Sequence, residues 1–143
     1  MSYRDGTVRG DDIEDLHAMR VSSRRLRAAM DAFAATFPEK SFRRNLQQVK
    51  RITDTLGHAR DLDVAIDSLS RLLPDLTAGE QVGVIALIEE YRDRRNGERR
   101  RIRRLFRDLD ESGFPRRFER WIAKHTGISA KKLTFRTPRR AGD

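Results

Sequence analysis

Apolar residues recur along this chain at steps of three, four and seven positions, which is the periodicity of amphipathic α-helices. In the first periodic stretch, Met19, Leu26 and Met30 fall on one side. No stretch alternates with period two for long enough to indicate a strand, so we expect an all-α fold. The pattern predicts five helices, over about residues 11–37, 41–56, 60–73, 80–110 and 115–124.

Glycine and proline mark the expected helix boundaries. Pro38 and Pro74 follow the first and third helices, Gly57 is expected to be the residue that stops the second, and Gly113 ends the fourth. Gly97, inside the long fourth helix, predicts a bend or break there. Because the connections are short, neighbouring helices should be antiparallel. The expected architecture is an antiparallel bundle of four to five helices, one of them long.

The composition fits one domain with flexible ends. Apolar residues make up 37% of the 143 residues and charged residues another 37%, as expected for long helices with narrow apolar faces. We expect a flexible lead-in over residues 1–10, the helical bundle over residues 11–125, and a basic, flexible tail over residues 126–143. The absence of cysteine excludes disulfides. No signal peptide or membrane-spanning run is evident, so the protein is expected to be cytoplasmic.

The charge of the chain indicates an anionic partner. Lys and Arg number 31 against 22 Asp and Glu, a formal net charge of +9, and only five of the cations are lysine. The arginine fork matches phosphate oxygens in a bidentate way and stays protonated. A phosphate-bearing partner is therefore expected, although an arginine-rich genome composition would produce the same bias.

The first predicted helix concentrates this charge. His17, Arg20, Arg24 and Arg27 follow at steps of three, four and three, so they occupy a sector roughly 80° wide beside the apolar side. Such closely spaced cations repel one another, and an anion must offset the repulsion. Carboxylates from neighbouring helices could supply it as an ordinary salt-bridge lattice. A bound polyanion is the other possibility.

Two more predicted helices carry basic flanks beside their apolar sides. The basic residues of these flanks are Arg43 and Lys50 in the second helix and Arg92, Arg99 and Arg103 in the fourth. If the flanks face each other, they form a basic channel suited to an extended polyanion. Proteins that bind single-stranded nucleic acid interleave aromatic residues for base stacking. Here the aromatics occupy core positions, which favours a ligand with phosphates and no bases.

Two stretches resemble the signatures of one family. The run from His17 to Arg27 (HAMRVSSRRLR) and the run from Leu56 to Val64 (LGHARDLDV) are similar to the two signatures of the CHAD domain, the conserved histidine α-helical domain. The resemblance implies a helical bundle whose basic pore binds inorganic polyphosphate, and an association with polyphosphate granules in bacteria. Some members are fused to, or work beside, triphosphate-processing enzymes. The matching positions, which the resemblance implies to be ligand-binding, are His17, Arg20, Arg24, Arg27 and Arg60.

The resemblance extends to the N-terminal half of that domain only. Nothing after Glu80 repeats the histidine motif, whereas the family's usual domain has a second half that does. The chain is then a half-domain that pairs with a copy of itself, a domain with a shallow pore, or a fragment. We favour a symmetric homodimer, which restores a two-sided channel.

Metal binding and catalysis are not indicated. Asp61 and Asp63 lie near His58, but residues two positions apart on a helix point about 200° away from each other. We interpret both as carboxylates at a helix N-terminus, where they complement the dipole. No nucleophilic triad or glycine-rich phosphate loop is present, so we expect no catalytic residue, no cofactor and no metal.

The predicted function is that of a polyphosphate-binding module with a histidine- and arginine-lined basic face. Two alternatives remain open. An RNA-binding role requires the basic tail, residues 131–140. A structural adaptor requires the face of His17, Arg20 and Arg24 to be buried against carboxylates of a partner.

Overall fold

A computed structural model of the protein describes residues 13–128, with side chains from residue 16 onward. The predicted lead-in and most of the predicted tail lie outside the described residues. The elements are α2 (Ile13–Ala32), the 3-10 turn η1 (Ala34–Thr36), α3 (Glu39–Leu72), the 3-10 turn η2 (Leu73–Asp75), α4 (Ala78–Glu111) and α5 (Phe114–Thr126). The described residues contain no strand. The prediction of an all-α helical bundle is confirmed.

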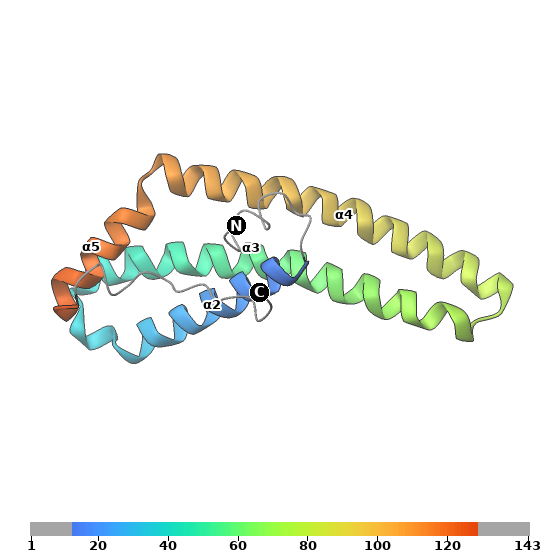
Figure 1. Ribbon diagram of the computed structural model, residues 1–143, viewed down its shortest axis with the longest axis horizontal. Coiled ribbons are helices and arrows are strands. Elements are labelled where there is room, and N and C mark those ends of the chain that lie inside the picture. Colours follow the sequence, from blue (N-terminus) through green and yellow to red (C-terminus); the bar gives the residue numbers. More distant parts are fainter. Residues whose placement is uncertain (1–12, 129–143) are drawn as a thin grey trace, which may run out of the picture.

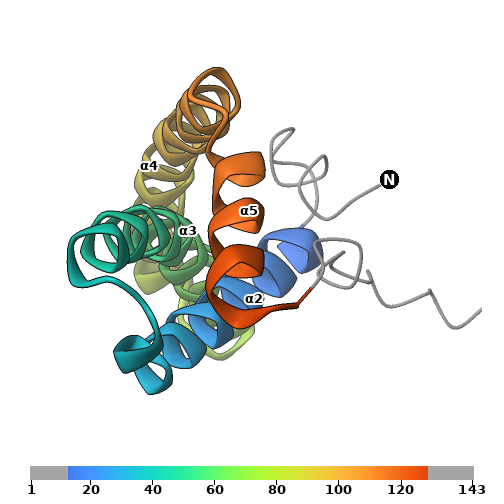
Figure 2. The same cartoon turned by 90° about the vertical axis from the view of Figure 1, so that its left-hand side faces the viewer.

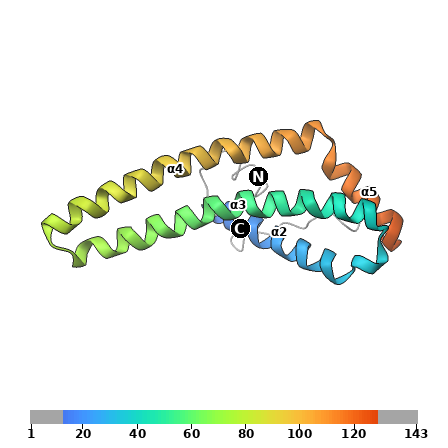
Figure 3. The ribbon, with the colours of Figure 1, turned by 180° about the vertical axis from the view of Figure 1, so that it is seen from behind.

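Two helices of 34 residues each, α3 and α4, form a long antiparallel hairpin. As Figures 1 and 3 show, α2 lies along the N-terminal half of α3 only, so the turn end of the hairpin extends beyond it. The end view in Figure 2 shows α5 crossing the other end of the bundle, beside α2. None of the described helices is long and apolar enough to cross a membrane.

The core lies at the end of the hairpin where four helices meet. Its buried residues come from all four: for example, Leu16 of α2, Leu56 of α3, Ile102 of α4 and Phe118 of α5 are at most 8% exposed. Burial of side chains of this size contributes about 1.5–3 kcal/mol each. No member of this core cluster lies between Ala59 and Ile102. The protruding half of the hairpin therefore has only its own two helices to pack together.

Gly57 does not end a helix, which corrects the prediction of two helices in this region. The chain is helical without interruption from Glu39 to Leu72, so Gly57 lies in the middle of α3. Asp61 and Asp63 are consequently mid-helix residues and not N-terminal carboxylates. Asp63 instead accepts a hydrogen bond from Arg95 of α4, with 2.7 Å between Oδ1 and Nε, and this ion pair is buried.

Two other boundary predictions need correction. The first helix ends at Ala32, five residues before the predicted end, because the chain turns through η1 into an extended Phe37. An extended conformation is the one favoured for a residue before proline, here Pro38. Gly97 causes no break, since α4 is helical from Ala78 to Glu111.

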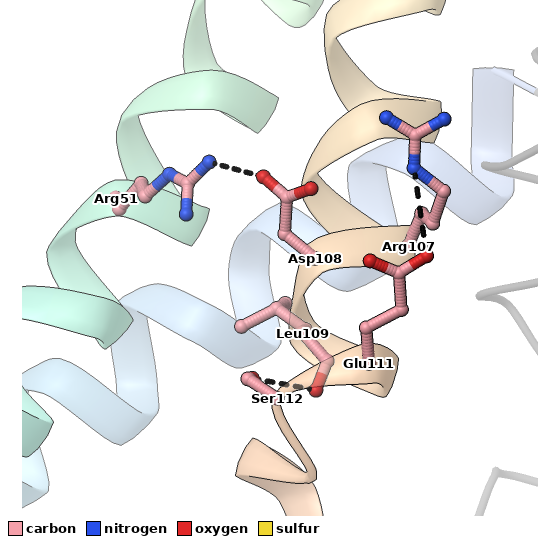
Figure 4. A network of polar contacts seen from close by, with 6 residues as sticks. All are labelled: Arg51, Arg107, Asp108, Leu109, Glu111 and Ser112. Carbon is pink, nitrogen blue, oxygen red and sulfur yellow. Dashed lines mark hydrogen bonds and ion pairs between the residues drawn. The ribbon is translucent and has the colours of Figure 1, made fainter.

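Polar contacts fix the two ends of α4. At its start, Gln81 Nε2 donates to the carbonyl oxygens of Leu73 and Leu76, which holds the turn between α3 and α4. Near its end, Arg51 of α3 reaches Asp108 with 2.9 Å between Nη2 and Oδ2 (Figure 4). This pair is about half exposed, so it contributes about 0.2–1 kcal/mol at most.

The last helix is positioned by stacked rings. Gly113 has φ of 64°, a conformation that favours glycine, and it allows the sharp turn from α4 into α5. Trp121 then stacks on Phe37 with 4.2 Å between ring centroids and donates from Nε1 to Ser41 Oγ at 3.0 Å. These contacts join α5 to the segment between α2 and α3.

Candidate functional site

A solvent-open pocket of about 450 Å³ lies between α2 and α3. The residues from α2 are Arg20, Arg24, Arg27, Ala28 and Asp31, and those from α3 are Thr53, Asp54, Gly57, His58 and Asp61. The three arginines are those that the sequence pattern placed in one sector of the first helix. The structure thus brings Arg20, Arg24 and Arg27 together at one concavity.

The side of the pocket formed by α2 follows from helix geometry. Arg20, Arg24, Arg27 and Asp31 follow at steps of four, three and four, so they form one row along the helix surface. Buried Leu16 and Met30 anchor the neighbouring face of α2 to the core. Arg20 and Arg27 are half-buried and Arg24 is exposed. The guanidinium groups therefore line the pocket while the helix itself is held by apolar contacts.

The opposite side is one face of α3. Asp54, Gly57, His58 and Asp61 are three, one and three positions apart, which places them on one side of a continuous helix. Arg20 passes close to Gly57, because its Nε is 3.9 Å from the position that a Cβ atom on the glycine would occupy. Arg20 thus lies beside the backbone of α3 at Gly57, at an ordinary van der Waals distance from the space of a methyl group.

The pocket contains anionic groups as well as cationic ones. Asp31, Asp54 and Asp61 line it together with the three arginines. Within the described part of the chain, no ion pair shorter than 4.0 Å joins these aspartates to these arginines. The carboxylates reduce the repulsion among the arginines through space. They do so without accepting hydrogen bonds from the guanidinium groups of these three arginines.

The other predicted site residues lie outside the pocket lining. His17 is half-buried on α2, one turn before Arg20, and its Nδ1 is buried with no hydrogen-bond partner among the described residues. On α3, Arg43 is exposed and pairs with Glu39, while Lys50 and Arg60 are half-buried. On α4, Arg92 and Arg103 are exposed, and Arg99 is half-buried with an unpartnered Nε. A channel across all three helices therefore stays a prediction.

Sequence reasoning missed much of the α3 side of the pocket as a site. Thr53, Asp54, Gly57, His58 and Asp61 were not predicted as one binding face, because a helix stop was expected at Gly57. Their spacing of one and three positions would have identified a single face if the helix had been taken as continuous. The second family-like run, residues 56–64, also contains three of them.

Three comparisons with known proteins bear on identity. Neither the comparison with curated proteins nor that with solved structures returns a match. The family model of the CHAD domain matches residues 1–142, a longer stretch than the two family-like runs, residues 17–27 and 56–64. Because this match spans nearly the whole chain and the fold is the helical bundle that the motifs implied, the protein belongs to the CHAD domain family.

Proposed function

We propose that this protein binds inorganic polyphosphate at the pocket between α2 and α3, as a binding module and not as an enzyme. The CHAD domain is a polyphosphate-binding helical domain. The observation that carries the proposal for this chain is the convergence of Arg20, Arg24 and Arg27 on one open pocket. Arginine offers paired donors to phosphate oxygens, and three of them in a row match a chain that carries a charge on each phosphate.

The chemistry of the pocket favours phosphate over nucleic acid. None of its lining residues is aromatic, so a base has no ring on which to stack. Without base stacking, RNA could bind only through its phosphate backbone, and such binding weakens strongly as the salt concentration rises. Polyphosphate needs only the phosphate contacts, so it is the ligand that this lining suits.

The ligand is longer than the pocket, so further basic residues should contact it. His17 continues the row of α2 by one turn, and Lys50 and Arg60 lie on α3. The arginines Arg92, Arg99 and Arg103 of α4 and the exposed Arg43 complete the proposed binding surface. Action beside a triphosphate-processing enzyme, at polyphosphate granules in the cytoplasm, belongs to the same proposal.

The test is a titration of the full chain with long-chain polyphosphate and, in parallel, with single-stranded RNA of matched charge at physiological salt. We expect much tighter binding of polyphosphate. Arg20→Ala with Arg24→Ala should weaken it by about tenfold or more for each arginine, since a hydrogen bond to a charged group contributes about 1.5–3 kcal/mol.

The matched control is Arg116→Ala with Arg117→Ala, which removes the same charge from exposed positions on α5. This control should retain most of the affinity. Equal loss in both double variants would mean that binding depends on net charge and not on the pocket. Equal, weak and salt-sensitive binding of polyphosphate and RNA would favour the RNA alternative over a dedicated polyphosphate site.

A further inference from the structure

The side of α4 that faces away from the core carries a row of exposed residues. At 100° per residue, this row lies roughly opposite the buried Arg95, Ile102 and Leu109. We call it the outer stripe. Its members, all exposed, are Val82, Ile85, Ala86, Glu89, Asp93, Asn96, Arg100, Arg104 and Arg107.

The outer stripe changes its chemistry at the middle. Before Asn96 it is apolar and acidic, and after Asn96 it is basic. Other charged residues of α4 pair along the helix, such as Glu90 with Arg94 and Glu98 with Arg101. In contrast, Glu89, Asp93, Arg100 and Arg104 form no ion pair with any other described residue.

The same division separates the protruding hairpin from the rest of the chain. Residues 61–93 contain eight acidic and two basic residues, a net charge of −6. Because the whole chain has a net charge of +9, the other residues together carry +15. The hairpin also exposes large apolar side chains: Val82 is 70% exposed, and Val64, Leu72 and Ile85 are each 45–46% exposed. An acidic surface with exposed apolar groups suits a partner that is basic and has aliphatic side chains.

A second copy of this chain meets that description in one particular register. If two α4 helices lie antiparallel about a two-fold axis between Asn96 and Gly97, residues at equal distances from that point face each other. Glu89 then faces Arg104 of the second copy, and Asp93 faces Arg100 of the second copy. The symmetry repeats both contacts, so one register pairs all four stripe charges that form no ion pair with another described residue.

Gly97 supports close approach at the centre of this arrangement. A glycine inside a helix is less favourable than an alanine. The packing of the chain itself does not require it, because a Cβ atom at this position would meet nothing within 4 Å. Absence of a side chain beside the outer stripe lets a second helix come closer to the backbone of α4.

We propose that two copies associate antiparallel along the outer stripes of α4, with Glu89–Arg104 and Asp93–Arg100 pairs between the copies. The aliphatic stems of Arg104 and Arg107 cover Ile85 of the partner copy. A parallel pair is disfavoured, because it places Glu89 against Glu89 and Arg104 against Arg104. Because exposed ion pairs are individually weak and are screened by salt, the association should be weak and sensitive to salt. It involves none of the pocket arginines and is independent of the proposed function.

Sedimentation equilibrium of the full chain over a range of concentrations, at low and at high salt, tests the proposal. The wild type should form a dimer at low salt that dissociates at high salt. Glu89→Arg with Asp93→Arg should be monomeric, and so should Arg100→Glu with Arg104→Glu. The variant that carries all four substitutions restores every pair in reverse and should dimerise again. Circular dichroism checks that each variant keeps its helical content.

The control is Arg116→Glu with Arg117→Glu, which makes the same charge change on α5 and should leave the dimer intact. A wild type that is monomeric at low salt would overturn the proposal and leave another basic protein as the partner of the hairpin. A wild-type dimer that survives the charge reversals, or a fourfold variant that fails to regain the dimer while folded, would also overturn it. Polyphosphate titration of the same variants reports separately on the pocket.

Discussion

Arg20 of α2 lies against the backbone of α3 at Gly57, where its Nε is 3.9 Å from the position of a Cβ atom on the glycine. This distance is an ordinary van der Waals separation, so an alanine fits at position 57 without moving the arginine. A branched side chain that continues beyond Cβ would occupy the space of the guanidinium group. The small residue at position 57 therefore leaves the space that the guanidinium group of Arg20 occupies.

Two substitutions at this position should have opposite outcomes. Gly57→Leu should displace Arg20 and weaken polyphosphate binding by roughly tenfold, the value of one charged hydrogen bond. Gly57→Ala should keep the affinity and raise the free energy of unfolding by about 1 kcal/mol, because alanine is the better helix former. Titration with polyphosphate and urea unfolding measure the two effects. If Gly57→Leu binds as tightly as Gly57→Ala, the position of Arg20 does not matter for the ligand.

The aspartates of the pocket should act against the ligand. Asp54 and Asp61 place two negative charges beside the arginines, where a polyanion must approach them. Asp54→Asn with Asp61→Asn should therefore strengthen polyphosphate binding by roughly threefold to tenfold at low salt. The affinity for RNA should rise by less, because a less densely charged polymer is repelled less strongly by the two carboxylates.

Asp75→Asn is the control for this prediction. It removes one exposed carboxylate at the turn end of the hairpin, away from the pocket, and should change both affinities little. Weaker polyphosphate binding in the Asp54 and Asp61 variant would show instead that these carboxylates position the arginines productively.

The periodicity of apolar residues predicted most of the fold, because the apolar stripe of each helix is the face that packs against the other helices. Met19, Leu26 and Met30 had the spacing of one buried face; Met30 is in the core, and Met19 and Leu26 pack against it. The spacing of Arg20, Arg24 and Arg27 also predicted their shared location. Such local geometry depends only on helical pitch, which the sequence encodes directly.

The α3 side of the pocket and the protruding hairpin depend on contacts between residues far apart in the sequence, which local spacing does not predict. A glycine after a periodic run resembles a helix end, whereas Gly57 lies in the middle of the continuous helix α3, where it packs beside Arg20 of α2. Asp63 and Arg95 are 32 positions apart, so their pairing could not be deduced from spacing. Charge segregation along the outer stripe of α4 was visible in the sequence, but its meaning depended on knowing that α4 has no break at Gly97.

The start of α4 should respond to pH through a capping box. Thr77 Oγ1 donates to Glu80 Oε2 at 2.7 Å, and the Thr77 backbone N–H donates to the same oxygen at 2.9 Å. These hydrogen bonds, the side-chain one first, hold the pKa of Glu80 below its ordinary value. A lowered folded-state pKa stabilises the fold above the unfolded pKa, and this contribution is lost as pH falls through the folded-state pKa.

Glu80→Gln should accordingly be less stable than the wild type at neutral pH and equal to it in acid. Urea unfolding followed by circular dichroism at both pH values measures the difference. Glu119→Gln, an exposed glutamate on α5, serves as the control and should show no such convergence. A stability difference for Glu80→Gln that persists unchanged in acid would contradict a role for the ionised carboxylate.

The buried pair of Asp63 and Arg95 should be the most costly polar contact to break. Their side chains are 7% and 9% exposed, and Arg95 Nη1 has no further partner. Asp63→Leu leaves a buried charge uncompensated and should lower the free energy of unfolding by about 3–5 kcal/mol, as should Arg95→Met. The double variant replaces both charges with apolar groups of similar size, so it should recover most of the loss. Urea unfolding of the four proteins gives the coupling energy.

The control is Arg51→Ala, which breaks the half-exposed pair with Asp108 and should lower the free energy of unfolding by at most about 1 kcal/mol. If the losses from Asp63→Leu and Arg95→Met simply add in the double variant, the two residues are not energetically coupled, and the protruding hairpin is held by its apolar contacts alone.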